Sequence, residues 1–327
     1  MNPKRILKRY LFPLLISFIF IYFLSTTIDF SESIRKFSGI RIYPFVISFF
    51  IYIIQYFFLA LRWRFLCGGI IGLDSFYYVT SIHNMTNNLM PMRTGELIYP
   101  YLLKRYFNVG LGDSAAYLIF ARIFDLIAMG VFFFFSILLT RDKITLFFGD
   151  IKAESLKFLL YLVILILVLG AIYWIFSKIT ESEKAEERYI VKTLKNGYSA
   201  LFKGMKKVGI IKKFFVLFLM SLAVFLARYT FFMFALITFG VELSFTQAVI
   251  VATAPILATV FPIQGIGGYG TIETGWVLGF MLIGLDKELA LISGFGAHSL
   301  HLLFSLVLSG ISFPLLNLKK SKLSEKK

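Results

Sequence analysis

The sequence predicts an all-α polytopic membrane protein, from its composition, its long apolar runs and two apolar stretches that are interrupted by polar residues. Of its 327 residues, 58% are hydrophobic and 16% are charged, and the mean hydropathy is +0.81. Soluble proteins are on the order of 45–50% apolar and 25% charged. A soluble domain of this size could not bury so much apolar surface, so a lipid bilayer is the expected environment.

Uninterrupted apolar runs predict six full crossings, because roughly 18–20 apolar residues span the hydrocarbon core of a membrane. The predicted crossings cover residues 11–28, 44–61, 113–140, 157–177, 214–239 and 288–314. Basic residues precede the first crossing and no small-residue cleavage site follows it, so it is expected to remain as a signal anchor.

Two further apolar stretches, residues 75–110 and 245–285, are broken in the middle. The breaks are Asn84–Glu96, which contains a proline and a glycine, and Pro262–Glu273, which contains four glycines. We predict that each stretch is a re-entrant pair of half-helices that enters and leaves the membrane on the same face. Irregular backbone at membrane depth is tolerated only where protein or a wet cavity surrounds it, so both breaks indicate an internal site.

The distribution of lysine and arginine predicts the orientation. With this topology, 24 of the 34 basic residues lie on the side of both termini, eight lie on the other side and two lie within crossings. Both termini are therefore expected in the cytoplasm, and the protein in the cytoplasmic membrane. The two broken segments then enter from opposite faces, so that residues 44–177 and 214–314 form an inverted repeat.

The polar residues outside the crossings have simpler interpretations. Residues 178–213 are expected to form a cytoplasmic amphipathic linker on the inner leaflet, or only a solvated linker, and residues 315–327 a basic cytoplasmic tail. The net charge of +16 favours membrane orientation over nucleic-acid binding, because it gathers at helix ends. Cys67 is the single cysteine, so no internal disulfide forms, and no Cys/His spacing predicts a metal or a cofactor.

Ionisable residues inside the crossings are the first candidates for a functional role. A charge at mid-membrane costs about 2.5–3.5 kcal/mol on insertion scales, yet Arg122, Asp125 and Arg228 all lie in apolar runs. Arg122 and Asp125 share a helix face and can pair, with or without a further role. Arg228 has no carboxylate three or four positions away, so its expected partner is Glu273 or an anionic ligand.

The first break contributes further candidates. Arg93 and Glu96 flank Gly95 just after Pro91, and half-helix N-termini suit anions such as phosphate. These side chains either bind a ligand or only satisfy a polar loop. The amide side chains beside them are Asn84, Asn87 and Asn88.

The second break and the last crossing supply the remaining candidates. Glycines in the break would let backbone or a headgroup approach closely, or would serve packing alone. His298 and His301 are candidates for a headgroup contact or a proton relay, or for a simple helix contact. The residues that shape the break are Pro262, Gly267, Gly268 and Gly270.

The two halves repeat nearly the same spacing. Glu96 precedes Arg122 by 26 positions, and Glu273 precedes His298 by 25. The next ionisable residue follows three positions later in each half: Asp125 and His301. A different role is expected for Arg62-Trp63-Arg64, which is typical of an interfacial anchor with snorkelling arginines and a belt tryptophan.

The chain resembles the flippase-like membrane region of lysyl-phosphatidylglycerol synthases over nearly its whole length. The resemblance implies that a charged lipid is moved between leaflets and not synthesised, because no counterpart of the soluble synthase domain is expected in this chain. Five motifs in their order and spacing carry the resemblance: Arg62-Trp63-Arg64, Asn84 through Pro91, Arg93-x-Gly95-Glu96, Arg122-x-x-Asp125 and Pro262 through Glu273.

We therefore expect a lipid flippase-like protein that is not an enzyme and needs no cofactor. Its expected partners are membrane lipids, either anionic or aminoacylated phospholipids or polyprenyl-linked lipids, and a homodimer is compatible with the sequence. Arg93, Arg122 and Arg228 would bind phosphate. Three acidic residues would balance those arginines or bind a cationic headgroup: Glu96, Asp125 and Glu273. The alternatives are an intramembrane enzyme acting on a lipid-linked phosphate or sugar, and an accessory subunit of cell-envelope synthesis.

Overall fold

The computed structural model describes residues 39–69, 71–140, 210–259 and 264–324. The predicted crossings at 11–28 and 157–177, most of the linker 178–213 and Pro262 lie outside these residues. Within the described residues all regular structure is helical, as predicted, and there is no strand.

Four long helices form the frame of the described part of the chain, and each contains a stretch long and apolar enough to cross a membrane. They are α3 (Ile42–Leu66), α6 (Leu111–Leu139), α9 (Ile210–Thr238) and α12 (Lys287–Ser324). Their positions agree with four of the predicted crossings. Two helices are longer than predicted, because α3 continues to Leu66 and α12 continues past residue 314 to Ser324.

The two broken stretches each fold as two shorter helices with a break between them. The first consists of α4 (Leu73–Leu89), the 3-10 helix η1 (Pro91–Leu97) and α5 (Ile98–Phe107). The second consists of α10 (Phe245–Ala258), the 3-10 turn η4 (Ile266–Gly268) and α11 (Thr271–Leu282). The described chain therefore runs twice through the order long helix, two short helices, long helix.

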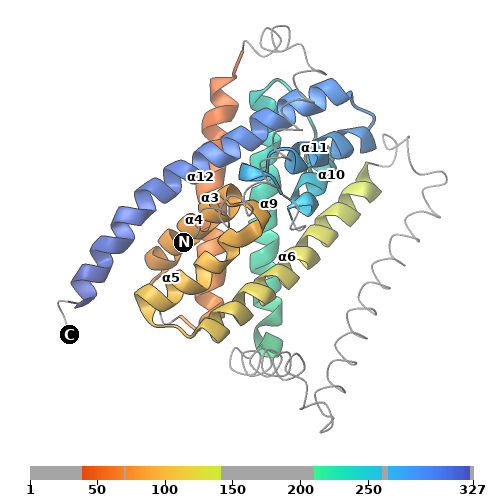
Figure 1. Ribbon diagram of the computed structural model, residues 1–327. Coiled ribbons are helices and arrows are strands. Elements are labelled where there is room, and N and C mark those ends of the chain that lie inside the picture. The colour runs from red at the N-terminus through yellow and green to blue at the C-terminus, as the bar shows by residue number, and fades with distance from the viewer. Residues whose placement is uncertain (1–38, 70, 141–209, 260–263, 325–327) are drawn as a thin grey trace, which may run out of the picture.

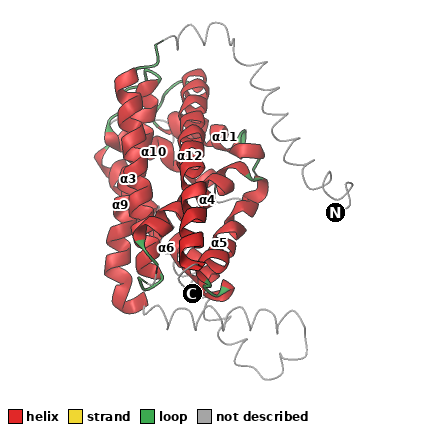
Figure 2. Ribbon diagram, turned by 90° about the vertical axis from the view of Figure 1, so that its left-hand side faces the viewer, coloured by secondary structure: helices red, strands yellow, loops and turns green. Residues whose placement is uncertain are grey.

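The two pairs of short helices lie at opposite ends of the long helices. In the view of Figure 1, α4 and α5 lie at the lower end and α10 and α11 at the upper end, and Figure 2 shows the same separation. At the lower end, the Tyr106 hydroxyl donates to Asn317 Oδ1 of α12 at 2.6 Å. At the upper end, Arg41 pairs with Glu242 at 2.5 Å. Between the ends, both α4 and η1 contact η4, so the two breaks meet inside the bundle.

Among the described residues, the two large clusters of the buried core each surround one pair of short helices. Tyr52, Trp276 and Phe304 belong to the upper cluster, and Phe76 and Tyr99 belong to the lower one. Helix α3 packs along α9 and contributes to both.

Large apolar side chains remain exposed on the outer faces of the long helices. Phe50 is 59% exposed, Phe135 57% and Leu306 52%. Exposed apolar surface on helices of this length is what a lipid-facing surface requires. The described part of the protein is therefore that of a membrane-embedded helical protein.

Local sequence explains where the short helices begin and end. Ser244 caps α10, since Gln247 N–H donates to Ser244 Oγ at 3.4 Å and Ser244 N–H donates to Gln247 Oε1 at 3.0 Å. Helix α5 ends at Asn108, whose φ of 54° is left-handed, a conformation that asparagine tolerates better than most residues. These helix ends determine where the chain changes direction before α10 and after α5.

Candidate functional site

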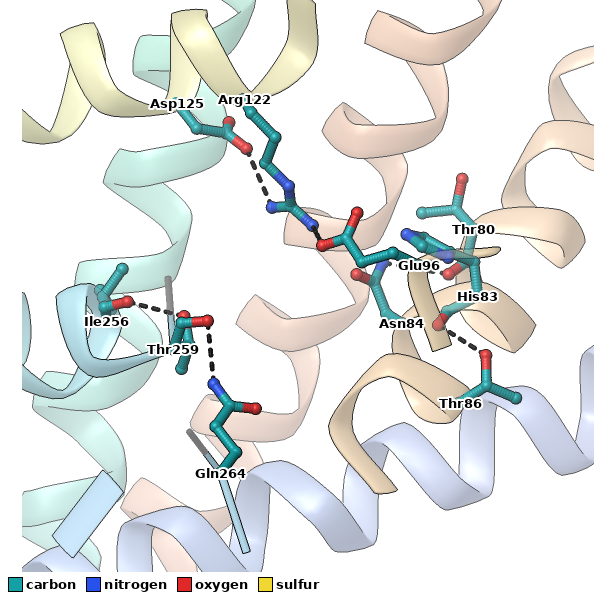
Figure 3. A network of polar contacts seen from close by, with 10 residues as sticks. All are labelled: Thr80, His83, Asn84, Thr86, Glu96, Arg122, Asp125, Ile256, Thr259 and Gln264. Atoms are coloured by element: carbon teal, nitrogen blue, oxygen red, sulfur yellow. Dashed lines mark hydrogen bonds and ion pairs between the residues drawn. The ribbon is translucent and has the colours of Figure 1, made fainter. Parts of the chain in front are cut away.

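A chain of charged side chains links the first break to the long helices. Arg122 of α6 lies between two carboxylates (Figure 3): its Nη2 is 2.6 Å from Glu96 Oε1, and its Nη1 is 3.4 Å from Asp125 Oδ2. Asp125 is held more closely by Arg62 of α3, at 2.5 Å, and Arg62 also donates to Ser221 Oγ of α9 at 2.9 Å. The network therefore joins η1, α6, α3 and α9.

The predicted anchoring role of Arg62 and Trp63 is wrong. Arg62 is 1% exposed and Trp63 is 4% exposed, and the Trp63 ring packs on Tyr99 with centroids 4.3 Å apart. Only Arg64 is exposed, as an interfacial residue would be. Arg62 turns inward because an ion pair with Asp125 offsets the cost of burying both charges, whereas either charge alone would be strongly unfavourable.

Gly95 holds η1 against α4, which positions Glu96. A Cβ atom at Gly95 would lie 2.5 Å from both the backbone nitrogen and Cα of Asn87. Because backbone cannot yield as a flexible side chain can, only glycine fits this contact. The neighbouring residue Glu96 is thereby placed within reach of Arg122.

The second break carries a different pair. Glu273, at the start of α11, is 0% exposed and lies 2.7 Å from His298 Nδ1 of α12. Its other oxygen accepts from the Gly270 N–H at 2.7 Å. Glu273 therefore stabilises the N-terminus of its own helix. The prediction that Glu273 is the partner of Arg228 is wrong, since histidine and backbone engage both of its oxygens.

The turn before α11 has the backbone that its glycines predict. Gly267, Gly268 and Gly270 have φ values of 67°, 78° and 93°, which residues with a Cβ adopt at a cost. The turn brings Gly268 to the cavity described below and presents the Gly270 N–H to Glu273.

Arg228 of α9 has no carboxylate within ion-pair distance among the described residues. Its guanidinium lies 4.9 Å from the centre of the Phe225 ring, a cation–π contact. A second arginine thus lies at mid-helix, near the ion-pair network but outside it.

A central chamber of about 100 Å³ lies where the two breaks meet. Side chains from α3, α4, α6, α9, α10, α11 and α12 form its wall, so every long helix contributes. Its lining is Gln55, Tyr56, Asn84, Asn87, Asn88, Arg122, Arg228, Phe231, Phe232, Pro255, Ile256, Thr259, Gln264, Gly268, Ile272, Trp276, His298 and His301.

A lateral groove of about 400 Å³ adjoins the chamber on the side of α6. Its outer part includes Ile119, Ile123 and Leu126, which are 43%, 45% and 46% exposed. Its full lining is Glu96, Leu118, Ile119, Arg122, Ile123, Asp125, Leu126, Met129, Phe225, Arg228, Ile256 and Thr259. Four of these also line the chamber: Arg122, Arg228, Ile256 and Thr259.

Most of the predicted site residues converge on these two cavities. Asn84 donates to the Thr80 carbonyl at 3.0 Å (Figure 3), and Asn88 lies 3.5 Å from Ser305 Oγ. His301 lies among the rings of Tyr52, Phe231 and Phe232. The side chains of Pro91 and Arg93 are not among those described. A headgroup-binding role for these residues stays a prediction.

Several residues that line the chamber are not among the predicted site residues, including Gln55, Gln264 and Trp276. Gln55 stands alone as an amide in the apolar run of α3, which is a pattern that could have identified it. Gln264 donates to the Thr259 carbonyl at 2.8 Å near the end of α10 (Figure 3). Trp276 is 0% exposed, and no simple pattern marks it as different from other core aromatics.

The fold and the cavities are those of a multi-pass helical membrane protein with a polar interior. Residues 10–309 match the family described as the lysylphosphatidylglycerol synthase TM region, and the chain belongs to this family. A UPF0104 membrane protein from Methanothermobacter thermautotrophicus is 25% identical over 245 residues, covering 71% of each chain. The family confirms the resemblance drawn from the motifs.

Proposed function

We propose that this protein translocates a charged phospholipid or a lipid-linked headgroup between the leaflets of the membrane. One observation carries the proposal: the polar chamber and the lipid-facing groove meet at Arg122 and Arg228, which line both. A lipid needs a polar path for its headgroup while its acyl chains remain in hydrocarbon. The chamber and the groove offer those two environments side by side.

The arrangement lowers the main barrier to leaflet exchange. A bare charge at mid-membrane costs at least about 2.5–3.5 kcal/mol. In the chamber a headgroup would meet amide, imidazole and guanidinium groups, while the groove would hold a chain against Ile119, Ile123 and Met129. The protein would act by supplying a solvating path, with no chemical step on the lipid.

The proposed topology follows from the same geometry. The two pairs of short helices would be re-entrant, would enter from opposite faces and would place both breaks near mid-membrane, as an inverted repeat does. Lys104 and Arg105 lie in the last turn of α5, and Lys319 of α12 pairs with Asp74 of α4. The end of the molecule that carries α4 and α5, the lower end in Figure 1, would therefore face the cytoplasm by the positive-inside rule. Two further crossings, at residues 11–28 and 157–177, and cytoplasmic termini complete this proposal, with the cytoplasmic membrane as its location.

Leaflet exchange in proteoliposomes tests the function. Fluorescent phosphatidylglycerol, lysyl-phosphatidylglycerol and a polyprenyl phosphate would be followed with wild-type protein, Glu96→Gln and Arg122→Ala. We expect exchange of at least one lipid, lost in both variants. Arg64→Gln is the matched control, since Arg64 is exposed and lines neither the chamber nor the groove. If no lipid exchanges while the protein elutes as a folded species, the transport proposal is wrong.

One observation favours the enzyme alternative. Glu273 and His298 form a buried carboxylate–imidazole pair in and beside the chamber wall, and such a pair can act as a general base. Product formation from a lipid-linked phosphate or sugar, abolished by His298→Gln, would favour this alternative over transport.

A further inference from the structure

We propose that the headgroup bound in the central chamber is a phosphate anion without a cationic group, carried by a lipid with hydroxyl groups and not by an aminoacylated one. This inference rests on the proposed function, because it names the lipid class that the chamber would take. Three observations support it: the engaged carboxylates near the chamber, the charge of Arg228, and the buried polar atoms without hydrogen-bond partners in the chamber wall.

The carboxylates near the chamber are already engaged. Glu96 pairs with Arg122 at 2.6 Å, Asp125 pairs with Arg62 at 2.5 Å, and Glu273 pairs with His298 at 2.7 Å. A lipid with an ammonium group would have to break one of these pairs to find a counter-charge. Among the described residues, Glu96 and Asp125 are the only carboxylates that line either cavity, and Glu273 lies beside the chamber wall.

Positive charge, by contrast, is left over. The two arginines of the network, Arg62 and Arg122, are balanced by its two carboxylates, whereas Arg228 has no ion-pair partner among the described residues. Arg228 lies where the chamber meets the groove. A phosphate at this junction would gain a charge-assisted hydrogen bond, whereas an ammonium group there would be repelled by both Arg228 and Arg122.

The rest of the wall suits neutral hydroxyl groups. Gln55 is 3% exposed and Trp276 is 0% exposed, and Gln55 Oε1, Asn87 Oδ1 and Trp276 Nε1 have no hydrogen-bond partner in the described structure. All three residues line the chamber. Buried polar groups of this kind are normally hydrogen-bonded. Two acceptors and one donor match the hydroxyl groups of a glycerol or sugar headgroup, which would reach these buried atoms once their side chains rotate toward the chamber.

Three fluorescent lipids that differ in charge test the headgroup class: phosphatidylglycerol, phosphatidylcholine and lysyl-phosphatidylglycerol. Binding to detergent-solubilised protein is measured by thermal shift, and exchange is measured in proteoliposomes. We expect phosphatidylglycerol to bind and exchange, with binding about 10- to 100-fold weaker in Arg228→Gln. Arg228→Lys should retain part of the binding, and Arg64→Gln should retain all of it.

The two measurements separate the two proposals. Equal or better binding of lysyl-phosphatidylglycerol would overturn the headgroup assignment and leave lipid transport standing. Binding of phosphatidylglycerol without exchange would keep the assignment and overturn transport. Inorganic phosphate and glycerol phosphate are added separately, because stabilisation by these as strong as by the lipid would show that the site takes a soluble phosphate and would overturn the lipid assignment.

Discussion

The two broken segments use nearly the same spacing for two different kinds of pair. Glu96 and Arg122 are 26 residues apart and form a carboxylate–guanidinium pair, with side chains that are 19% and 37% exposed. Glu273 and His298 are 25 residues apart and form a pair that is 0% and 2% exposed. The first pair lies beside the groove and the second is buried at the chamber, so the repeated spacing serves two environments.

The two halves differ more clearly at the residue that lies three positions after Arg122 in the first half and after His298 in the second. In the first half it is Asp125, which neutralises Arg62. In the second half it is His301, which packs among aromatic rings, and Arg228 is left without a carboxylate among the described residues. The described charges of the first half therefore pair with one another, whereas the second half contains an arginine without a carboxylate partner among the described residues.

The largest effect is expected from breaking the buried pair of the first half. Arg62→Leu would leave Asp125 buried with only the longer contact to Arg122, and should destabilise the protein by about 3–5 kcal/mol. The double variant Arg62→Leu with Asp125→Leu should be markedly more stable than Arg62→Leu alone. Thermal unfolding in detergent measures both. Equal destabilisation by the two variants would mean that the charge pair has no structural role.

Removing the two glutamates should have unequal effects on stability. Glu273→Ala strips His298 and the Gly270 N–H of their acceptor and should cost about 1–3 kcal/mol of unfolding free energy. Glu96→Ala should cost less, because its pair is partly exposed and partly screened, while it should still impair leaflet exchange. Similar stability losses in the two variants would contradict the difference in burial drawn between the two halves.

Two glycine-to-alanine substitutions test the contact that positions Glu96. Gly95→Ala forces a Cβ onto the α4 backbone and should destabilise by about 1–3 kcal/mol, with exchange reduced as η1 moves away. Gly112→Ala is the control, because a Cβ there meets nothing within 4 Å. In a helix that substitution should be neutral or stabilising by up to about 1 kcal/mol. A neutral Gly95→Ala would show that η1 adapts freely.

The smallest expected effect concerns Cys67, which should not react with maleimide at neutral pH. Burial raises the pKa of the Cys67 thiol to about 12, so at pH 7–8 it is protonated, and the thiolate is the reactive form. Its reactivity should rise only as the pH approaches that value. Rapid labelling of native wild-type protein at pH 7 would disprove the burial.

Because Cys67 should not react, single cysteines introduced near the two broken segments can report which side of the membrane each segment faces. Lys104→Cys at the end of α5 and Lys287→Cys at the start of α12 are both exposed. An impermeant maleimide added to whole cells should label Lys287→Cys and spare Lys104→Cys until the membrane is opened. Labelling of both from one side would rule out segments that enter from opposite faces.

Much of this molecule could be predicted from its sequence. Hydropathy predicted α3, α6, α9 and α12, since apolar length alone decides which helices can span a bilayer. Proline and glycine predicted both breaks, and the rarity of charge in apolar runs identified Arg122, Asp125 and Arg228. Pairs within one helix, such as Arg122 with Asp125, follow from helical periodicity.

The choice of partner across helices was decided only by tertiary structure. Arg62 could have snorkelled or turned inward, and it turned inward because α6 brings Asp125 to it. Glu273 could have paired with Arg228 or with His298, and the depth of α11 against α12 selects the histidine. Sequence determines which side chains need a partner at membrane depth, through the cost of burying them. Packing of distant helices determines which partner is within reach, and so which charge remains without an ion-pair partner among the described residues.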